Sequence, residues 1–147
     1  MILVDANLLL YACDASSPRH DAARLWWEAR LSEPDPVRLA WVTIIAFVRI
    51  GTHPRVFSQP LSVAEARDHV EAWLARPMVD VLHPTPRHRE IFARLLGQAQ
   101  ATGNPVTDAH LTALAVEHGA TLCSTDGDFA RFDGLAWANP LDDATSG

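Results

Sequence analysis

Short apolar runs alternate along the chain with longer segments in which apolar residues recur at helical spacing. A short, wholly apolar run is typical of a strand buried on both faces of a parallel sheet, whereas apolar positions three and four residues apart indicate a helix. The strands predicted on this basis cover residues 2–4, 38–41, 78–82, 121–124 and 135–137. The predicted helices cover residues 6–12, 19–31, 42–52, 63–75 and 85–100, and a last one runs from 107 or 108 to 119.

Residues that are common in turns and at the ends of helices support several of these boundaries. Ser62 and Glu65 have the spacing of a capping box, in which each side chain bonds the other residue's backbone N–H. The Gly-Asn-Pro sequence at 103–105 predicts a turn before the last helix, and Gly119 predicts its end. Strands that alternate with helices predict an α/β domain with a mostly parallel sheet of four to five strands.

Length and composition fit one globular domain. The chain has 147 residues, of which 48% are hydrophobic and 20% charged, and it shows no repeat or linker. Residues 142–147 are predicted to be a frayed tail. No apolar run reaches the roughly 18 residues of a membrane span, and the N-terminus lacks the basic start of a signal peptide. We therefore expect a cytoplasmic protein that does not associate with membranes.

The charged residues exclude several classes of function. All 12 residues in the Lys and Arg total are Arg, so Schiff-base enzymes, P-loop NTPases and β-lactamase-like enzymes, which need a lysine, are excluded. The net charge of −6 excludes a general nucleic-acid coat but not a local groove lined by Arg. Cys13 and Cys123 are too far apart for a CxxC motif, and we expect two small buried thiols.

Four aspartates stand at related places in the predicted fold. Asp5 ends the first strand, Asp126 and Asp128 follow the strand at 121–124, and Asp108 lies at the start of a helix. Carboxyl ends of strands line the ligand crevice of open α/β sheets, so these acids could converge there. Clustered carboxylates repel one another, and a hard cation such as Mg²⁺ relieves that repulsion.

Each aspartate also has a structural interpretation. Asp108 could cap its helix, and Asp126 could cap the turn that begins at Phe129. Asp5 is harder to explain in this way, because an acid directly after a buried strand rarely lacks a partner. Taken singly, each would more often be structural, but their joint placement favours a common site.

Three motifs follow one another along the chain: VDANLL at 4–9, VTDAHL at 106–111 and STDGDF at 124–129. In this order they resemble the motifs of PIN-domain nucleases over essentially the whole chain. The stretch AFVRIGTHPRVF at 46–57 is similar to a branch of VapC toxins, the ribonuclease half of VapBC toxin–antitoxin pairs. The resemblance implies one three-layer α/β/α sandwich over residues 1–147.

The resemblance also implies an activity, a cofactor and partners. It implies a metal-dependent endoribonuclease that acts on RNA with Mg²⁺ or Mn²⁺, is neutralised by a VapB-like antitoxin and forms homodimers. The metal ligands it implies are Asp5, Asp108 and Asp126, with Asp128 as a further catalytic residue. Asn7 and Ser124 match family positions that orient the carboxylates and the metal-bound water.

One position departs from the family pattern. Most PIN nucleases carry a Glu on the helix at 42–52, where this chain has Ala46, and no acid lies between Asp35 and Glu65. Either the remaining aspartates suffice for cleavage, or the chain is a PIN module that binds RNA or antitoxin and cuts weakly or not at all. A haloacid-dehalogenase-like phosphatase is disfavoured, because Asn7 stands where that class needs a second Asp.

Candidate contacts with macromolecules come from a few further residues. Arg49 and Arg55 flank a Thr-His-Pro segment and are the first candidates for RNA phosphate contacts. His110 is interpreted as a packing or surface histidine, because it lies about 200° around the helix from Asp108.

The adjacent tryptophans at 26 and 27 project about 100° apart on a helix and cannot share one narrow stripe. An apolar stripe of Ala22, Leu25, Trp26 and Ala29 is predicted to face the core. Trp27 is then predicted to be partly exposed. With residues of the helix at 42–52, it would line a groove for an antitoxin segment. A broad buried helix face is the alternative.

Overall fold

The computed structural model describes residues 1–99 and 104–142, in which five parallel strands form one sheet in the order β3-β2-β1-β4-β5. The strands are β1 (Ile2–Val4), β2 (Val37–Leu39), β3 (Val79–Val81), β4 (Thr121–Cys123) and β5 (Trp137–Ala138). The helices are α1 (Ala6–Cys13), α2 (His20–Ser32), α3 (Trp41–Gly51), α4 (Val63–Leu74), α5 (His88–Ala99) and α6 (Asn104–His118), followed by the 3₁₀ helix η1 (Gly127–Arg131). The α/β fold and its parallel sheet are therefore confirmed.

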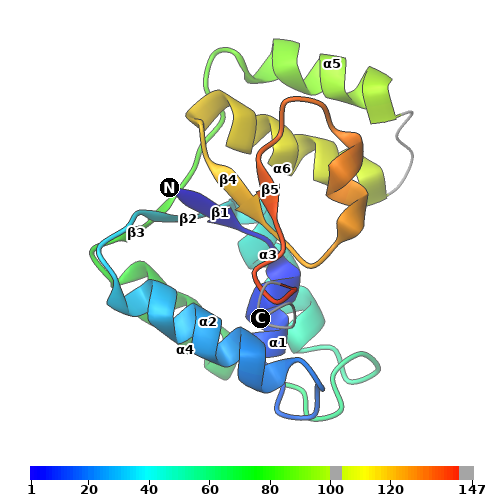
Figure 1. Cartoon of the computed structure of the whole chain (residues 1–147). Coiled ribbons are helices and arrows are strands. Elements are labelled where there is room, and N and C mark those ends of the chain that lie inside the picture. The colour runs from blue at the N-terminus through cyan, green and yellow to red at the C-terminus, as the bar shows by residue number, and fades with distance from the viewer. Residues whose placement is uncertain (100–103, 143–147) are drawn as a thin grey trace.

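Two hydrophobic cores lie on the two faces of the sheet, which gives the three layers that were predicted (Figure 1). Side chains alternate between the faces along each strand. Val4 and Cys123 belong to the core shared with α1, α2, α3 and α4, while Leu3 and Leu122 belong to the core shared with α5, α6 and η1. The sheet is thus covered on both sides, as its wholly apolar strands require.

The order of the strands creates a switch point beside β1. From β1 the chain moves outward to β2 and β3, then returns to place β4 against the other side of β1. Val4 pairs with Cys123, and the Asp5 N–H donates to the carbonyl of Cys123 over 2.9 Å. Ligands of open α/β sheets bind where the strand order reverses, outside the carboxyl ends of the strands. Asp5 and Ser124 are the first residues after β1 and β4 at this point.

The start of α6 differs from the prediction. The helix begins at Asn104, so the predicted turn is wrong at Asn104 and Pro105, and Gly103 lies outside the described residues. Pro105 is tolerated because a helix leaves its first N–H groups unbonded. Asp108 therefore lies in the second turn and does not cap the helix. The predicted stop at Gly119 is confirmed by its φ of 66°.

The face that α2 buries is turned by about 100° from the predicted one. Trp27 is only 4% exposed and shares a buried stripe with Ala23 and Leu31, whereas Leu25 is 60% exposed. The indole of Trp27 packs edge-on against that of Trp73 on α4. Because α1 and α4 cover this stripe, the prediction of a partly exposed Trp27 that acts with α3 is wrong, and the buried helix face is confirmed.

Other sequence predictions can be compared directly. The capping box is confirmed, with hydrogen bonds of 3.0 and 2.9 Å between Ser62 and Glu65. Cys13 and Cys123 form no disulfide, and burial raises the pKa of each thiol to about 11. No helix among the described residues is long and apolar enough to cross a membrane. The predicted tail at 143–147 and the predicted helix end at Gln100 lie outside those residues.

Candidate active site

Asp5 is held at the sheet edge by two hydrogen bonds. It is the N-cap of α1, where its Oδ1 accepts the N–H of Ala6 over 2.8 Å, and its Oδ2 accepts the hydroxyl of Ser124 over 2.8 Å. Burial raises the pKa of Asp5, these two hydrogen bonds lower it, and the charge of Asp126 raises it further. The carboxylate is therefore fixed in position and exposed to the field of another acid.

Ser124 connects the ends of the two central strands. Its side chain is fully buried, and its Oγ accepts hydrogen bonds from Asn7 Nδ2 at 3.1 Å and from the Asp126 N–H at 3.0 Å. The indole N–H of Trp137 on β5 donates to the Ser124 carbonyl over 3.1 Å. Ser124 thus contacts both the carboxylate of Asp5 and the backbone of Asp126, and Asn7 contacts Ser124.

Asp126 and Asp128 occupy different surroundings in the turn after β4. Asp126 is half-buried and caps η1, with its Oδ1 accepting the Asp128 N–H over 2.9 Å. Asp126 thus caps this turn, as its structural interpretation proposed, but the turn begins at Gly127, two residues before Phe129. The Asp128 side chain is 70% exposed and forms an ion pair of 3.1 Å with Arg131. Asp128 therefore lies at the rim of the site and is partly neutralised.

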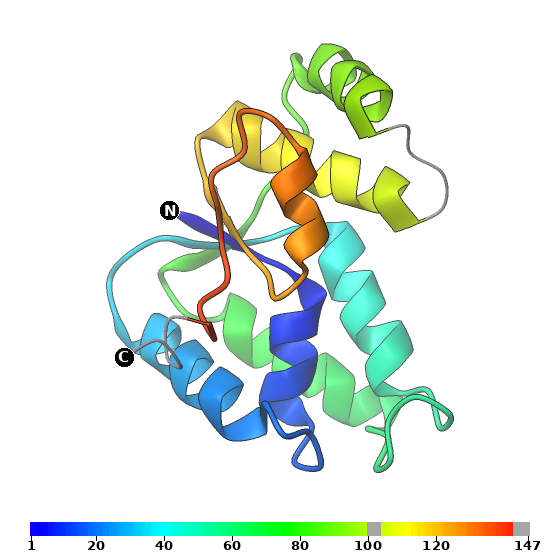
Figure 2. The ribbon, with the colours of Figure 1, turned by 45° about the vertical axis from the view of Figure 1, so that its right-hand side comes forward.

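Asp108 completes the acidic group from the opposite layer of the fold. The start of α1, the first half of α6 and η1 converge at one place (Figure 2). Burial raises the pKa of Asp108 to about 6, and the charges of Asp126, Asp5 and Asp128 contribute in the same direction against Arg131. The other three predicted aspartates are thus close enough to act on the charge of Asp108. We call Asp5, Asp108, Asp126 and Asp128 the acidic cluster.

The chemistry of the acidic cluster suits a hard divalent cation. Among the described residues, no three His, Cys, Asp or Glu side chains lie close enough to hold a metal ion together. Mg²⁺ usually takes one or two carboxylates and completes its shell with waters and substrate phosphate, so it does not require three. The donors are all oxygen atoms, and a cation would relieve the repulsion from Asp126, Asp5 and Asp128, which adds to the effect of burial on the Asp108 pKa. The residues therefore fit Mg²⁺ or Mn²⁺ better than Zn²⁺.

The other predicted site residues lie on α3 and the loop after it. Ala46 is half-buried in α3, while Arg49 and Arg55 are exposed. In the part of the chain that the structure describes, neither Arg has a carboxylate within ion-pair distance. Within residues 1–99 and 104–142, no ion pair joins these arginines to the acidic cluster, and both remain available to bind an anion.

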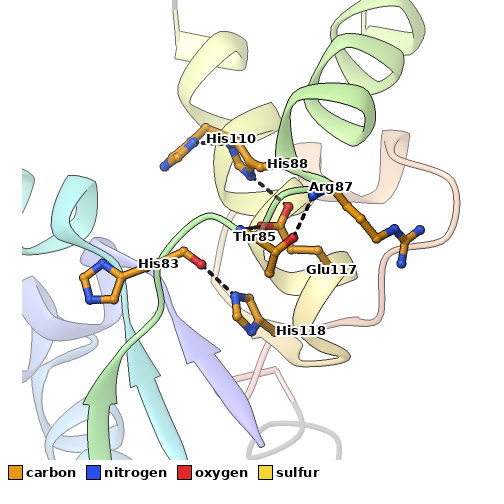
Figure 3. Close-up of polar contacts among 7 residues, drawn as sticks. All are labelled: His83, Thr85, Arg87, His88, His110, Glu117 and His118. Carbon is orange, nitrogen blue, oxygen red and sulfur yellow. Dashed lines mark hydrogen bonds and ion pairs between the residues drawn. The ribbon is translucent and has the colours of Figure 1, made fainter.

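A second polar group, which sequence reasoning missed, extends along α6 from His110 to Glu117 (Figure 3). The buried carboxylate of Glu117 accepts the Thr85 N–H at 2.7 Å and His88 Nδ1 at 2.8 Å, and His88 Nε2 lies 3.0 Å from His110 Nδ1. We call Glu117, His88 and His110 the clasp. His110 also packs edge-on against Phe92, which confirms that it is a packing histidine.

One signal in the sequence could have revealed half of the clasp. His110 and Glu117 are seven residues apart and so share one face of a helix. Their partner His88 is on α5, and only the tertiary fold brings it there. The clasp, together with a hydrogen bond of 2.8 Å from His118 Nε2 to the His83 carbonyl, fastens the segment before α5 to the end of α6.

Comparison with known sequences identifies the family. The sequence model of the PIN domain matches residues 2–135, which is nearly the whole chain. The chain therefore belongs to the PIN domain family. It is 45% identical to Ribonuclease VapC37 of Mycobacterium tuberculosis over 95% of this chain and 97% of that protein. It is also 39% identical to Ribonuclease VapC33 of the same species, over 96% and 99%.

Solved structures share the fold at lower identity. VapBC2 from Rickettsia felis, bound to a DNA fragment from its promoter, matches with a TM-score of 0.67 and 18% identity over 95% of this chain and 98% of that one. Mycobacterium tuberculosis VapC20, described as a sarcin–ricin loop cleaving toxin, matches with a TM-score of 0.65 and 20% identity over 88% and 93%. At these identities the likeness concerns the fold.

Proposed function

We propose that this protein is a metal-dependent endoribonuclease that hydrolyses RNA phosphodiester bonds and acts as the toxin of a toxin–antitoxin pair. The observation that carries the proposal is the acidic cluster at the switch point between β1 and β4, where the charges of aspartates from distant parts of the sequence act on Asp108. Relatives at 45% and 39% identity named as VapC ribonucleases support the same reaction.

Within this proposal each residue of the site has a distinct task. One or two carboxylates among Asp5, Asp108 and Asp126 would hold Mg²⁺ or Mn²⁺, and waters and the substrate phosphate would complete its shell. The bound cation would polarise the scissile phosphate and lower the pKa of a water molecule. Ser124 and Asn7 would keep Asp5 and Asp126 correctly oriented through the hydrogen bonds given above. Asp128 would act from the rim of the site.

Arg49 and Arg55 would bring the RNA to a protein whose net charge is unfavourable for a polyanion. Each is exposed and has no carboxylate partner among the described residues, so its charge is available to a phosphate. Phosphate contacts of this kind supply affinity without sequence preference.

Cleavage of RNA by the purified chain tests the reaction. We expect antitoxin-free protein to cut a structured RNA with Mg²⁺ or Mn²⁺ and to stop when EDTA is added. Asp5→Asn and Asp126→Asn should each lower the rate on the order of 100-fold or more, because metal ligands act as one unit. Asp68→Asn removes an exposed carboxylate from α4 and serves as the matched control.

The alternative is a PIN module that binds RNA or antitoxin without effective cleavage, and the absence of a carboxylate at Ala46 favours it. If the wild-type chain binds RNA and cuts none of a wide set of RNAs with either metal, the alternative replaces the proposal. Ala46→Glu then becomes informative, because an added ligand would raise activity only where the cluster already holds a cation.

The proposed partner is a VapB-like antitoxin, as the structures of VapBC complexes with this fold suggest. A cavity of about 240 Å³ lies between α1, α2 and α4 and is lined in part by Trp27, His69 and Trp73. We place an antitoxin segment in this cavity, where it would contact the exposed imidazole of His69.

A matched pair of variants tests the antitoxin site. His69→Ala removes an exposed side chain from the lining of the cavity, and we expect antitoxin affinity to fall about 10-fold. Asp68→Ala, next to it on α4 and outside that lining, should leave affinity unchanged. Equal affinities of the two variants would move the antitoxin to another surface.

The proposal also includes a homodimer, which the family resemblance implies. Two copies would bring two acidic clusters into one assembly. Light scattering on antitoxin-free protein tests this directly: we expect twice the chain mass of 16.1 kDa at micromolar concentration, and the mass of a single chain there would contradict it.

A further inference from the structure

Trp41 differs from the other tryptophans of the chain in its exposure. It is 53% exposed, whereas Trp27 and Trp73 are 4% and 6% exposed, and Trp26 and Trp137 are half-buried. A tryptophan left in water forgoes a large gain from burial, so its position calls for an explanation.

The place of Trp41 relative to the acidic cluster follows from the topology. Trp41 is the first residue of α3 and comes two residues after the end of β2. Strand β2 lies parallel to β1 and next to it, so Trp41 and Asp5 lie at the same edge of the sheet. Ala40 belongs to the core on the α6 side and Ile44 to the core on the α1 side. The start of α3 therefore spans the edge beside the acids (Figure 2).

An exposed stripe on α3 combines an aromatic ring with a positive charge. Trp41, Ile45 and Arg49 are spaced four residues apart and all are exposed, so they share one side of the helix. Eight residues of helix place Arg49 about 12 Å from Trp41 along the axis. An aromatic platform and a nearby cation are the groups that bind single-stranded nucleic acid, through base stacking and phosphate contact.

We propose that Trp41 stacks on one unpaired base of the RNA substrate beside the acidic cluster, while Arg49 binds a phosphate of the same strand. This inference rests on the proposed function and adds a residue that selects single-stranded RNA. A second copy of the chain is a weaker occupant for this stripe. A stable dimer buries roughly 800 Å² per partner, and the exposed apolar part of the stripe consists of two side chains.

Binding to a non-cleaving variant tests the inference independently of catalysis. In the Asp5→Asn background, the Kd of a short fluorescein-labelled single-stranded RNA is measured by anisotropy. Trp41→Ala should weaken binding about 5- to 100-fold, and Trp41→Phe should restore most of the affinity, because phenylalanine also stacks. Leu25→Ala, which removes an equally exposed apolar side chain from α2, is the matched control and should bind normally.

A set of RNAs that each lack one base identifies the stacked nucleotide. With Trp41 present, one abasic position should weaken binding well beyond the others. With Trp41→Ala, the same position should cause no additional loss, because the two changes remove one contact. Arg49→Ala should weaken all of these RNAs about equally.

Three results would overturn the inference. They are unchanged affinity of Trp41→Ala, equal responses to every abasic position in both proteins, and a loss that appears only as a change from dimer to monomer in light scattering. A wild-type chain that cuts no RNA refutes the proposed reaction instead, since the binding measurements do not depend on cleavage.

Discussion

Helix α6 carries one carboxylate near each end, and the two meet opposite surroundings. Glu117 is fully buried, yet its oxygen atoms accept the Thr85 N–H and His88, so its charge is compensated. Asp108 is less buried, but burial raises its pKa, and the charges of Asp126, Asp5 and Asp128 raise it further. A carboxylate with hydrogen-bond donors strengthens the fold, whereas one surrounded by like charges lowers stability and is available to a cation. The difference separates a structural polar group from a functional one.

Loss of the Glu117 side chain should have the largest effect on stability. Glu117→Ala leaves the Thr85 N–H and His88 without their partner, and we expect the free energy of unfolding to fall by about 3–5 kcal/mol. Glu117→Gln keeps an acceptor for Thr85 and should cost less than half as much. Urea unfolding of the three proteins measures this, and a cost for Glu117→Ala within error of zero would remove the contrast between the two ends of α6.

Asp108→Asn should raise the stability of the protein and lower its activity. The substitution removes one of the mutually repelling charges, so unfolding should become harder by about 1 kcal/mol after allowance for solvent screening. RNA cleavage should fall on the order of 100-fold or more, because a metal ligand is lost. Calorimetry and a cleavage assay on the same sample test both parts. A less stable Asp108→Asn protein would mean that Asp108 is a structural residue like Glu117.

The pH dependence of stability gives a third comparison. The pKa of Asp108 is about 6 in the folded protein and 3.8 without the fold, so the folded state binds its proton more tightly. The contribution of Asp108 to the free energy of unfolding is therefore fully present below about pH 4 and is lost as the pH rises through 6. The difference in unfolding free energy between wild type and Asp108→Asn should change by about 1 kcal/mol across that range in metal-free buffer. A difference that stays constant would contradict the raised pKa.

Asp128→Asn should have the smallest effect. Its side chain is mostly exposed and paired with Arg131, so it adds little to the field at the centre of the acidic cluster. We expect a few-fold loss of cleavage and a change in stability of about 0.5 kcal/mol or less. A loss of cleavage as large as that of Asp108→Asn would mean that Asp128 contributes as much to metal binding as Asp108 does.

The sequence predicted those parts of the site that depend on local pattern. Asp5 could be placed because it directly follows a buried apolar run, and Asp126 because it follows the strand predicted at 121–124, since the ends of parallel strands share one edge. The start of α6 was predicted too late because Asn104 and Pro105 are common in turns but are also tolerated in the first turn of a helix.

The parts that failed depend on tertiary contacts. Helix α2 has two apolar stripes, one with Leu25 and Trp26 and one with Ala23 and Trp27, and only packing against α1 and α4 selects the second. The pairing of Glu117 with His88 joins residues on two helices, and no spacing in the sequence encodes it. The distance between the acids likewise depends on how α6 sits over the sheet.

Binding of Mg²⁺ or Mn²⁺ tests the central claim, that the acidic cluster of this chain holds a divalent cation, without reference to any substrate. Isothermal titration calorimetry at pH 7.5 should detect one or more cations per wild-type chain, and thermal unfolding should shift upward with metal concentration. Asp108→Asn and Asp126→Asn should bind far more weakly, while Asp68→Asn should match wild type. If wild type and Asp108→Asn gain the same thermal stability from Mn²⁺, the aspartates do not share a cation and the account is wrong.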